Sequence, residues 1–189
     1  MKLKVERGTW NVKTGIRVLA LAASVLALAE GAYAEGTLRI VPVVRAEQVL
    51  VSVELDNGYT EEVREVINGG VRTTFTYTVD LKMIVPAWVD RTIATAVITI
   101  TDHYDTISRV HNLSRSVDGR VVEAQVTENE AIAKKWLTSL NGLVLCRTSK
   151  LDPHKEYYVR ISAHVRPPGA TLLGWATGVT NLAKFTFVP

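Results

Sequence analysis

The strongest structural signal in the chain is the stretch VRTTFTYTVDL at residues 71–81. Apolar and polar side chains alternate along it, so that Phe75, Tyr77 and Val79 share one face while threonines occupy the other. Thr73 is the only polar residue on the apolar face. Alternation of period two with one apolar face is typical of a strand in an antiparallel sheet that has one buried and one solvated side.

Other segments repeat this pattern on both sides of that stretch. Residues 49–55 and 157–165 alternate in the same way, and residues 92–101 are apolar on both faces, which predicts a more central strand. A hairpin is expected with arms at residues 107–114 and 120–126. Its turn would be Val117-Asp118-Gly119, because Asp-Gly favours the positive φ angles of a tight turn. A last strand is predicted at residues 184–188.

Two segments favour short helices instead. In residues 59–70, Thr60 can cap the helix and glutamates follow in its first turn. The second helix is expected to open with Thr127-Glu128-Asn129-Glu130, read as a capping box with Thr127 as N-cap, and to end at Asn141-Gly142. Its expected inner stripe is Ile132, Trp136 and Leu140.

These elements predict a mainly β fold: an antiparallel β-sandwich, immunoglobulin-like or similar, with seven or eight strands and two short helices. The chain has one cysteine, Cys146, so no internal disulfide can form. Its apolar neighbours indicate a small buried hydrophobe, with a reactive thiol or an intermolecular bridge as the alternative.

The N-terminus has the three parts of a secretory signal peptide. Basic residues precede an apolar run at residues 18–29, and the small-x-small triplet Ala32-Tyr33-Ala34 follows. The run is shorter than a bilayer span. We therefore predict a cleavable signal peptide at residues 1–34 and a single sandwich domain at residues 35–189. A buried N-terminal helix and an uncleaved anchor are the alternatives.

The predicted mature protein has no net charge. The whole chain has 22 basic and 19 acidic residues, and the leader accounts for the entire excess of +3. Nucleic-acid binding would require a basic surplus, so it is not expected. The predicted location is the periplasm, with no transmembrane span after cleavage.

Few residues suggest catalysis. No nucleophile elbow, phosphate-binding loop or zinc motif is present, and we predict no catalytic, cofactor-binding or metal-ligating residue. The densest polar group is Asp102, His103, Tyr104 and Asp105. This segment is interpreted as a turn between strands whose aspartates accept from turn amides, with acid–base chemistry as the alternative.

An apolar group in the C-terminal part is the predicted contact surface. Leu172, Leu173 and Trp175 follow Pro167-Pro168-Gly169 in a segment without clear periodicity. They either cover one end of the sandwich or contact a partner, since aromatic residues on loops are common anchors of protein interfaces.

Several short motifs resemble an exported bacterial family catalogued as domain of unknown function 4390. They are VSVELDN at 51–57, EEVREVI at 61–67, GVRTTFTY at 70–77, WVD at 88–90, Tyr104-Asp105, residues 143–151 and YYVR at 157–160. The resemblance covers most of the mature part. It implies an exported domain and supplies neither an activity nor a site residue.

Two functions are compatible with these observations. The first is a non-enzymatic interaction or binding module of the cell envelope, with an envelope protein as partner. Its contact surfaces would be the loop at residues 172–175 and an exposed sheet edge. The second is an envelope enzyme of the hydrolase type that uses His103 with Asp102 or Asp105. This alternative requires those side chains to converge in a cleft.

Overall fold

The computed structural model describes residues 37–166 and 177–188, which form a mainly β domain with two helices. In chain order the elements are β1 (Thr37–Arg45), β2 (Gln48–Asp56), α2 (Glu61–Asn68), β3 (Thr73–Met83), β4 (Arg91–Asp105), β5 (Val110–Val117), β6 (Arg120–Thr127), α3 (Glu130–Thr138), β7 (Ser139–Arg147), a 3-10 turn (Thr148–Lys150), β8 (Glu156–Arg166) and β9 (Thr177–Thr186).

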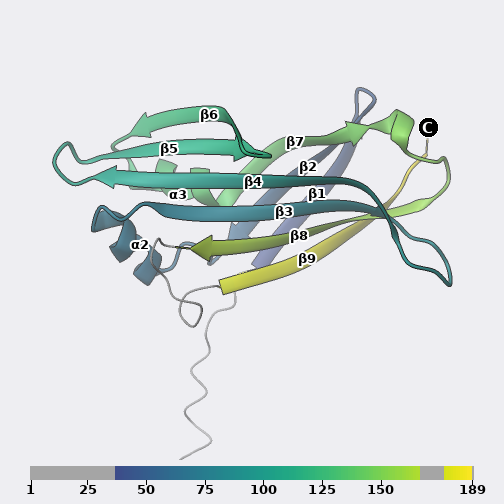
Figure 1. Cartoon of the computed structure of the whole chain (residues 1–189), viewed down its shortest axis with the longest axis horizontal. Coiled ribbons are helices and arrows are strands. Elements are labelled where there is room, and N and C mark those ends of the chain that lie inside the picture. Colours follow the sequence, from purple (N-terminus) through teal and green to yellow (C-terminus); the bar gives the residue numbers. More distant parts are fainter. Residues whose placement is uncertain (1–36, 167–176, 189) are drawn as a thin grey trace, which may run out of the picture. The chain divides into compact units, whose positions relative to one another are not determined.

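The strands form two antiparallel sheets of unequal width. The smaller sheet has the order β1-β2-β7, and the larger has the order β6-β5-β4-β3-β8-β9. Figure 1 shows the smaller sheet lying behind the larger one. This arrangement confirms the predicted antiparallel sandwich.

The strand count differs from the prediction. The described residues contain nine strands, where seven or eight were expected. The division into three and six strands is not the arrangement of an immunoglobulin domain, whose sheets contain four and three strands in the seven-stranded form. The sequence patterns therefore predicted the architecture correctly, as a sandwich that is similar to an immunoglobulin domain in its layers and different in its strand order.

The core is built from the inward faces of the strands that the alternation predicted. In β3, Phe75, Tyr77 and Val79 are buried, and so is Thr73. The inward residues of the two flanking strands are also buried: Ala96, Ile98 and Ile100 in β4, and Tyr157, Val159, Ile161, Ala163 and Val165 in β8. As expected, β4 is an interior strand, with β3 on one side and β5 on the other.

Among the described residues, the two sheets approach each other most closely along one side. There β1 of the smaller sheet lies against β9 and β8 of the larger one. The Asn181 amide on β9 donates to the Leu38 carbonyl on β1 at 2.6 Å. Leu38 itself is buried. This side of the sandwich is therefore closed.

Helices cover the part of the larger sheet that the smaller sheet does not reach. α3 packs on β4, β5 and β6, and α2 packs on β3 and β4. The predicted cap of α2 is confirmed: Thr60 Oγ1 accepts from the Val63 amide at 3.4 Å. The Leu137 carbonyl near the end of α3 accepts from the Tyr77 hydroxyl at 2.6 Å.

The second helix differs from its prediction at both ends. Its N-cap is Asn129, whose side chain accepts from the Ala131 and Ile132 amides, whereas Thr127 accepts from the Asn129 amide. This shift changes the inward residues to Ala133 and Leu137, and it leaves Ile132 43% exposed. Of the predicted stripe, Ile132 is wrong, Trp136 is partly buried against the core, and Leu140 is buried but lies in β7 and not in the helix.

The predicted helix stop at Asn141-Gly142 is also wrong. The helix ends at Thr138, and β7 begins at once with Ser139, so both residues lie in a strand. Gly142 has a φ of +64°, which is unfavourable for other residues, and its amide donates to Ser52 Oγ on β2 at 3.2 Å. The glycine therefore permits an irregularity in β7 and does not cap a helix.

The predicted hairpin is confirmed with a shifted first arm. β5 and β6 are joined by Asp118 and Gly119, with φ angles of 49° and 78°. β5 starts at Val110 because Arg109 and the three residues before it form the turn after β4. β9 likewise starts earlier than residue 184. Within residues 37–166 and 177–188, every helix is too short or too polar to cross a membrane.

We expect Tyr77→Phe to lower the free energy of unfolding by about 1–3 kcal/mol, because it leaves the buried Leu137 carbonyl without its donor. Urea unfolding measures the change. Val121→Ala is the control, since Val121 is 68% exposed and its truncation should change the free energy by less than about 0.5 kcal/mol. Equal stabilities of wild type and Tyr77→Phe would contradict the role given to this hydrogen bond.

Candidate functional site

The polar segment from Asp102 to Asp105 is the end of strand β4 and not a turn. Successive residues therefore face opposite sides of the sheet: Asp102 is completely buried and His103 is exposed. The prediction that an aspartate accepts from turn amides is confirmed for Asp105. Its carboxylate accepts from the Ile107 amide at 2.8 Å and from the Ser108 amide at 3.2 Å. These bonds lower the pKa of Asp105. The structure does not bring Asp102 and His103 together.

Asp102 pairs instead with a histidine that the sequence did not connect to it. His111 Nδ1 lies 2.8 Å from Asp102 Oδ2, and the two side chains are 3% and 0% exposed. They come from the neighbouring strands β5 and β4, on the inward face. The Tyr104 ring lies 4.7 Å from the His111 ring. The second oxygen, Asp102 Oδ1, has no hydrogen-bond partner among the described residues.

The sequence contained a signal for this pair. Asp102 lies on the same inward face of β4 as Ile98 and Ile100. His111 lies on the same inward face of β5 as the buried Leu113. Treating residues 102–105 as a turn interrupted that register. The burial of Asp102 raises its pKa above the ordinary 3.8, and the hydrogen bond to His111 opposes this effect.

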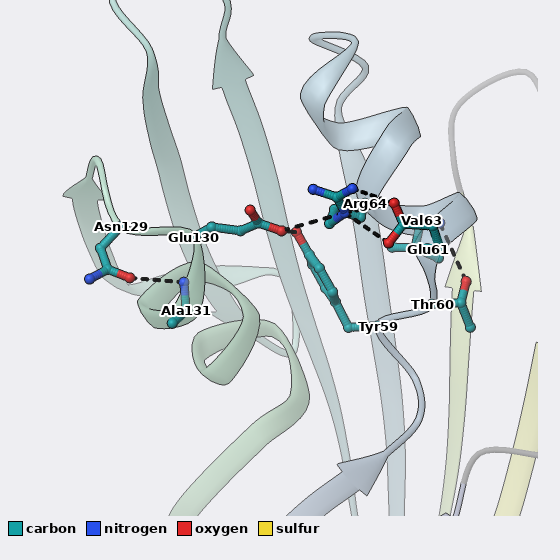
Figure 2. Close-up of polar contacts among 8 residues, drawn as sticks. All are labelled: Tyr59, Thr60, Glu61, Val63, Arg64, Asn129, Glu130 and Ala131. Carbon is teal, nitrogen blue, oxygen red and sulfur yellow. Dashed lines mark hydrogen bonds and ion pairs between the residues drawn. The ribbon is translucent and has the colours of Figure 1, made fainter.

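The N-terminal parts of α2 and α3 are linked by contacts to one carboxylate (Figure 2). The Tyr59 hydroxyl donates to Glu130 Oε1 at 3.4 Å, and Arg64 Nε lies 4.0 Å from the same oxygen. Arg64 also pairs with Glu61 on its own helix. Burial, reinforced by Glu130, raises the pKa of Tyr59. These contacts join the two helices on the inward side of the larger sheet.

A groove of about 630 Å³ opens between α3 and the hairpin β5–β6. Its lining includes an apolar part from the helix and polar groups from the strands on either side. The lining residues are Arg115, Glu123, Asn129, Ala131, Ile132, Lys135, Trp136, Ser139 and Asn141. They come from β5, β6, α3 and β7, so the groove lies where the two sheets diverge.

Arg115 fixes the geometry of this groove. Its guanidinium lies 4.4 Å from the Trp136 ring centroid and donates to Glu123 Oε2 at 2.8 Å. It also donates to the carbonyls of Trp136 and Ser139 at 3.4 Å, at the C-terminal end of α3. A cation is favourable at that end of a helix. One side chain therefore holds β5, β6 and α3 at a defined spacing.

Both sheets end at this open side with edge strands. β6 is the last strand of the larger sheet, and Val121, Val122 and Val126 on it are 59–68% exposed. β7 is the last strand of the smaller sheet. An edge strand carries unpaired backbone N–H and C=O groups that can pair with another chain. β6 contains no proline, one of the residues that block such pairing.

Two further predictions concern Cys146 and the apolar group in the C-terminal part. Cys146 on β7 is buried, as expected, and burial raises the pKa of its thiol. Leu172, Leu173 and Trp175 lie outside the described residues. Within the described parts of the chain, no group of three or more His, Cys, Asp or Glu side chains is placed to hold a metal ion.

Together these features define a class of protein: a β-sandwich domain of unequal sheets, closed at β1 and β9 and open at β6 and β7. The chain belongs to the family DUF4390, a domain of unknown function, whose model matches residues 38–167. The match covers β1 to β8 and includes both helices and the groove. No curated protein matches the chain, and no solved structure does.

The buried carboxylate makes stability depend on pH in a definite direction. Because the pKa of Asp102 is raised in the folded state, its stabilising contribution is complete below the unfolded pKa of about 3.9 and is lost as the pH rises through the folded pKa. We therefore expect the free energy of unfolding of wild type to fall relative to that of Asp102→Asn as the pH rises from 4. Urea unfolding between pH 3 and 7 measures this difference.

Asp105→Asn is the matched control, because its stability difference from wild type should depend on pH in the opposite direction. The turn amides lower the pKa of Asp105, so its contribution is present above the unfolded pKa and is lost as the pH falls through the folded pKa. Wild type should therefore gain stability relative to Asp105→Asn as the pH rises from 2 to 4. If the free energy of unfolding of wild type rises relative to that of Asp102→Asn above pH 4, the raised pKa of Asp102 is contradicted.

Proposed function

We propose that this protein is a non-enzymatic binding module of the bacterial cell envelope, exported to the periplasm, which holds an extended segment of a partner protein at the open side of the sandwich. The observation that carries the proposal is the position of the groove. It lies beside the free edge of β6 and is bounded by α3.

The edge strand and the helix offer complementary interactions to an extended chain. The free backbone groups of β6 can add a strand by ordinary β-sheet hydrogen bonds, which gives affinity without requiring one sequence. Ile132, 43% exposed on α3, and the partly buried Trp136 offer apolar contacts to alternate side chains of that strand. A groove between an edge strand and a helix therefore suits a peptide better than a compact ligand.

The charges of the groove favour a partner segment with a carboxylate. Arg115 is already paired with Glu123. Lys135 lines the groove and is exposed, and among the described residues no carboxylate lies within 4.0 Å of its amine. An acidic residue on the bound segment can pair with this lysine at the rim, which mainly affects specificity and association rate.

Export and the absence of catalysis are parts of the proposal with separate support. Export is supported by the signal pattern of residues 1–34. The hydrolase alternative required His103 to converge with Asp102 or Asp105 in a cleft. Asp102 lies on the opposite face of β4 from His103, and the Asp105 carboxylate accepts from the turn amides of Ile107 and Ser108. The Asp102–His111 pair lies on the inward face of the sheet, which suits a structural role.

Ile132→Glu should weaken peptide binding at least roughly tenfold, because it places a carboxylate on the apolar wall of the groove. The protein for the test is the chain of residues 35–189, and its peptide is selected from a random displayed library. The dissociation constant is measured by isothermal titration calorimetry. Leu182→Glu is the control: Leu182 is 50% exposed and lies on β9, at the other edge of the larger sheet.

The two variants separate a local effect from a general one. The proposal expects Leu182→Glu to bind within about twofold of wild type and expects both variants to unfold at the wild-type urea midpoint. A selected peptide that binds wild type and Ile132→Glu equally well would exclude the groove as its site. A library that yields no peptide for the wild-type domain would contradict the proposed function.

A further inference from the structure

The loop between β3 and β4 carries the most exposed tryptophan of the described residues. Trp88 is 81% exposed and its neighbour Val89 is 79% exposed. An isolated exposed apolar side chain is ordinary on a protein surface, whereas a tryptophan beside a valine at the tip of one loop forms a compact apolar projection. The groove at the open side of the sandwich does not include this loop.

This loop is held in one conformation by hydrogen bonds at its base. The Trp88 amide donates to the Val85 carbonyl at 3.1 Å. The Asp90 carboxylate accepts from the Val85 amide at 3.3 Å and from the Tyr158 hydroxyl of β8 at 2.9 Å. The projection is therefore already ordered, so little conformational entropy is lost when it contacts another surface.

Several other chain segments meet at the same end of the domain. The Thr148 amide donates to the Glu47 carbonyl of the β1–β2 turn, and the Phe187 amide after β9 donates to the Lys155 carbonyl. The Ile84 amide at the start of the loop donates to the Glu156 carbonyl. Figure 1 shows the β3–β4 loop and the segment between β7 and β8 at the same end of the larger sheet, with the β1–β2 turn further up on that side. We call this region the Trp88 end.

The Trp88 end is basic, whereas the charges of the opposite end are nearly balanced. At the Trp88 end, the basic residues are Arg45, Lys82, Arg91, Arg147, Lys150, Lys155 and Lys184, and the acidic residues are Glu47, Asp90, Asp152 and Glu156. At the opposite end, the connections counted with their adjoining strand residues (37–39, 54–75, 103–112, 125–141 and 164–166) contain eight acidic and seven basic residues. A domain with little net charge is thus polarised along its strands.

We infer that the Trp88 end docks on the surface of an anionic phospholipid bilayer. Tryptophan is enriched at membrane–water interfaces because its ring is apolar and its N–H is polar. Basic side chains are attracted to the negative surface potential of an anionic leaflet, and their excess at the Trp88 end orients that end toward the bilayer. The basic excess is spread over four segments around a projecting loop, which suits a broad, uniformly charged surface better than a pocket on a protein.

This docking is independent of the proposed peptide site. It uses the loop at residues 84–90 and the surrounding turns, whereas the groove uses α3, β5, β6 and β7. A domain bound to lipid by the Trp88 end leaves the groove available to a partner. Variants at the two sites can therefore be tested in separate assays, and failure in one assay does not imply failure in the other.

The test is flotation of the chain of residues 35–189 with vesicles of equal parts phosphatidylglycerol and phosphatidylcholine, and with vesicles of phosphatidylcholine alone. The described core lies wholly between Leu38 and Phe187, so this chain contains it all and lacks the apolar N-terminal run. We expect binding only to the anionic vesicles. Trp88→Ala should lower the partition coefficient roughly tenfold through lost apolar burial, and Trp88→Phe should lower it less.

Ile107→Ala is the matched control, because Ile107 is 93% exposed but lies in the turn at the opposite end. It should bind vesicles as wild type does. Replacing both Lys150 and Lys155 by glutamine should lower binding to anionic vesicles roughly tenfold or more, and 0.5 M salt should nearly abolish it. All variants should retain peptide binding at the groove.

Three results would overturn the inference. The first is that wild type does not float with anionic vesicles at low salt, which would leave the Trp88 loop as a contact for protein alone. The second is that Trp88→Ala and Ile107→Ala bind equally. The third is equal binding to neutral and anionic vesicles, which would show that the basic residues have no part in the contact.

Discussion

The unequal width of the two sheets is the constraint on which the rest of the structure depends. A three-stranded sheet cannot cover the inward face of a six-stranded one, and the closed contact of β1 with β9 fixes which half it covers. Helices α2 and α3 cover β4 and β5 instead. The groove lies beside α3, where β6 is an edge strand with no further strand on its outer side. The candidate site thus follows from the unequal widths of the two sheets and from the contact between β1 and β9.

The helical cover explains why polar groups are buried at this side of the domain. Asp102 and His111 occupy inward positions on β4 and β5, the strands on which α3 packs. Buried charged groups cost stability unless they are paired. The pair meets this requirement in part, since Asp102 Oδ1 has no partner among the described residues. Burying this carboxylate therefore costs stability, and its contact with His111 joins β4 to β5 beneath the helices.

The sequence was most informative where alternation alone decides the structure. In β2, β3 and β8 every residue predicted to face inward within the strand is buried, because one-sided burial imposes period two directly. β1 was missed, since Pro42 interrupts an apolar pattern in which several valines are exposed. The ends of α3 were wrong because Thr127 and Asn129 are both good caps, and the choice depends on where β6 ends. The Asp102–His111 pair required the strand register, which no local pattern contains.

The central claim is that an extended partner segment adds to the free edge of β6 beside α3. Amide hydrogen exchange of the domain with and without a bound selected peptide tests this claim most directly. The edge amides of residues 120–127 should exchange more slowly in the complex, because they gain hydrogen-bond partners, while those of residues 177–186 at the opposite edge should not change. Unchanged exchange in residues 120–127, or protection confined to another strand, would contradict it.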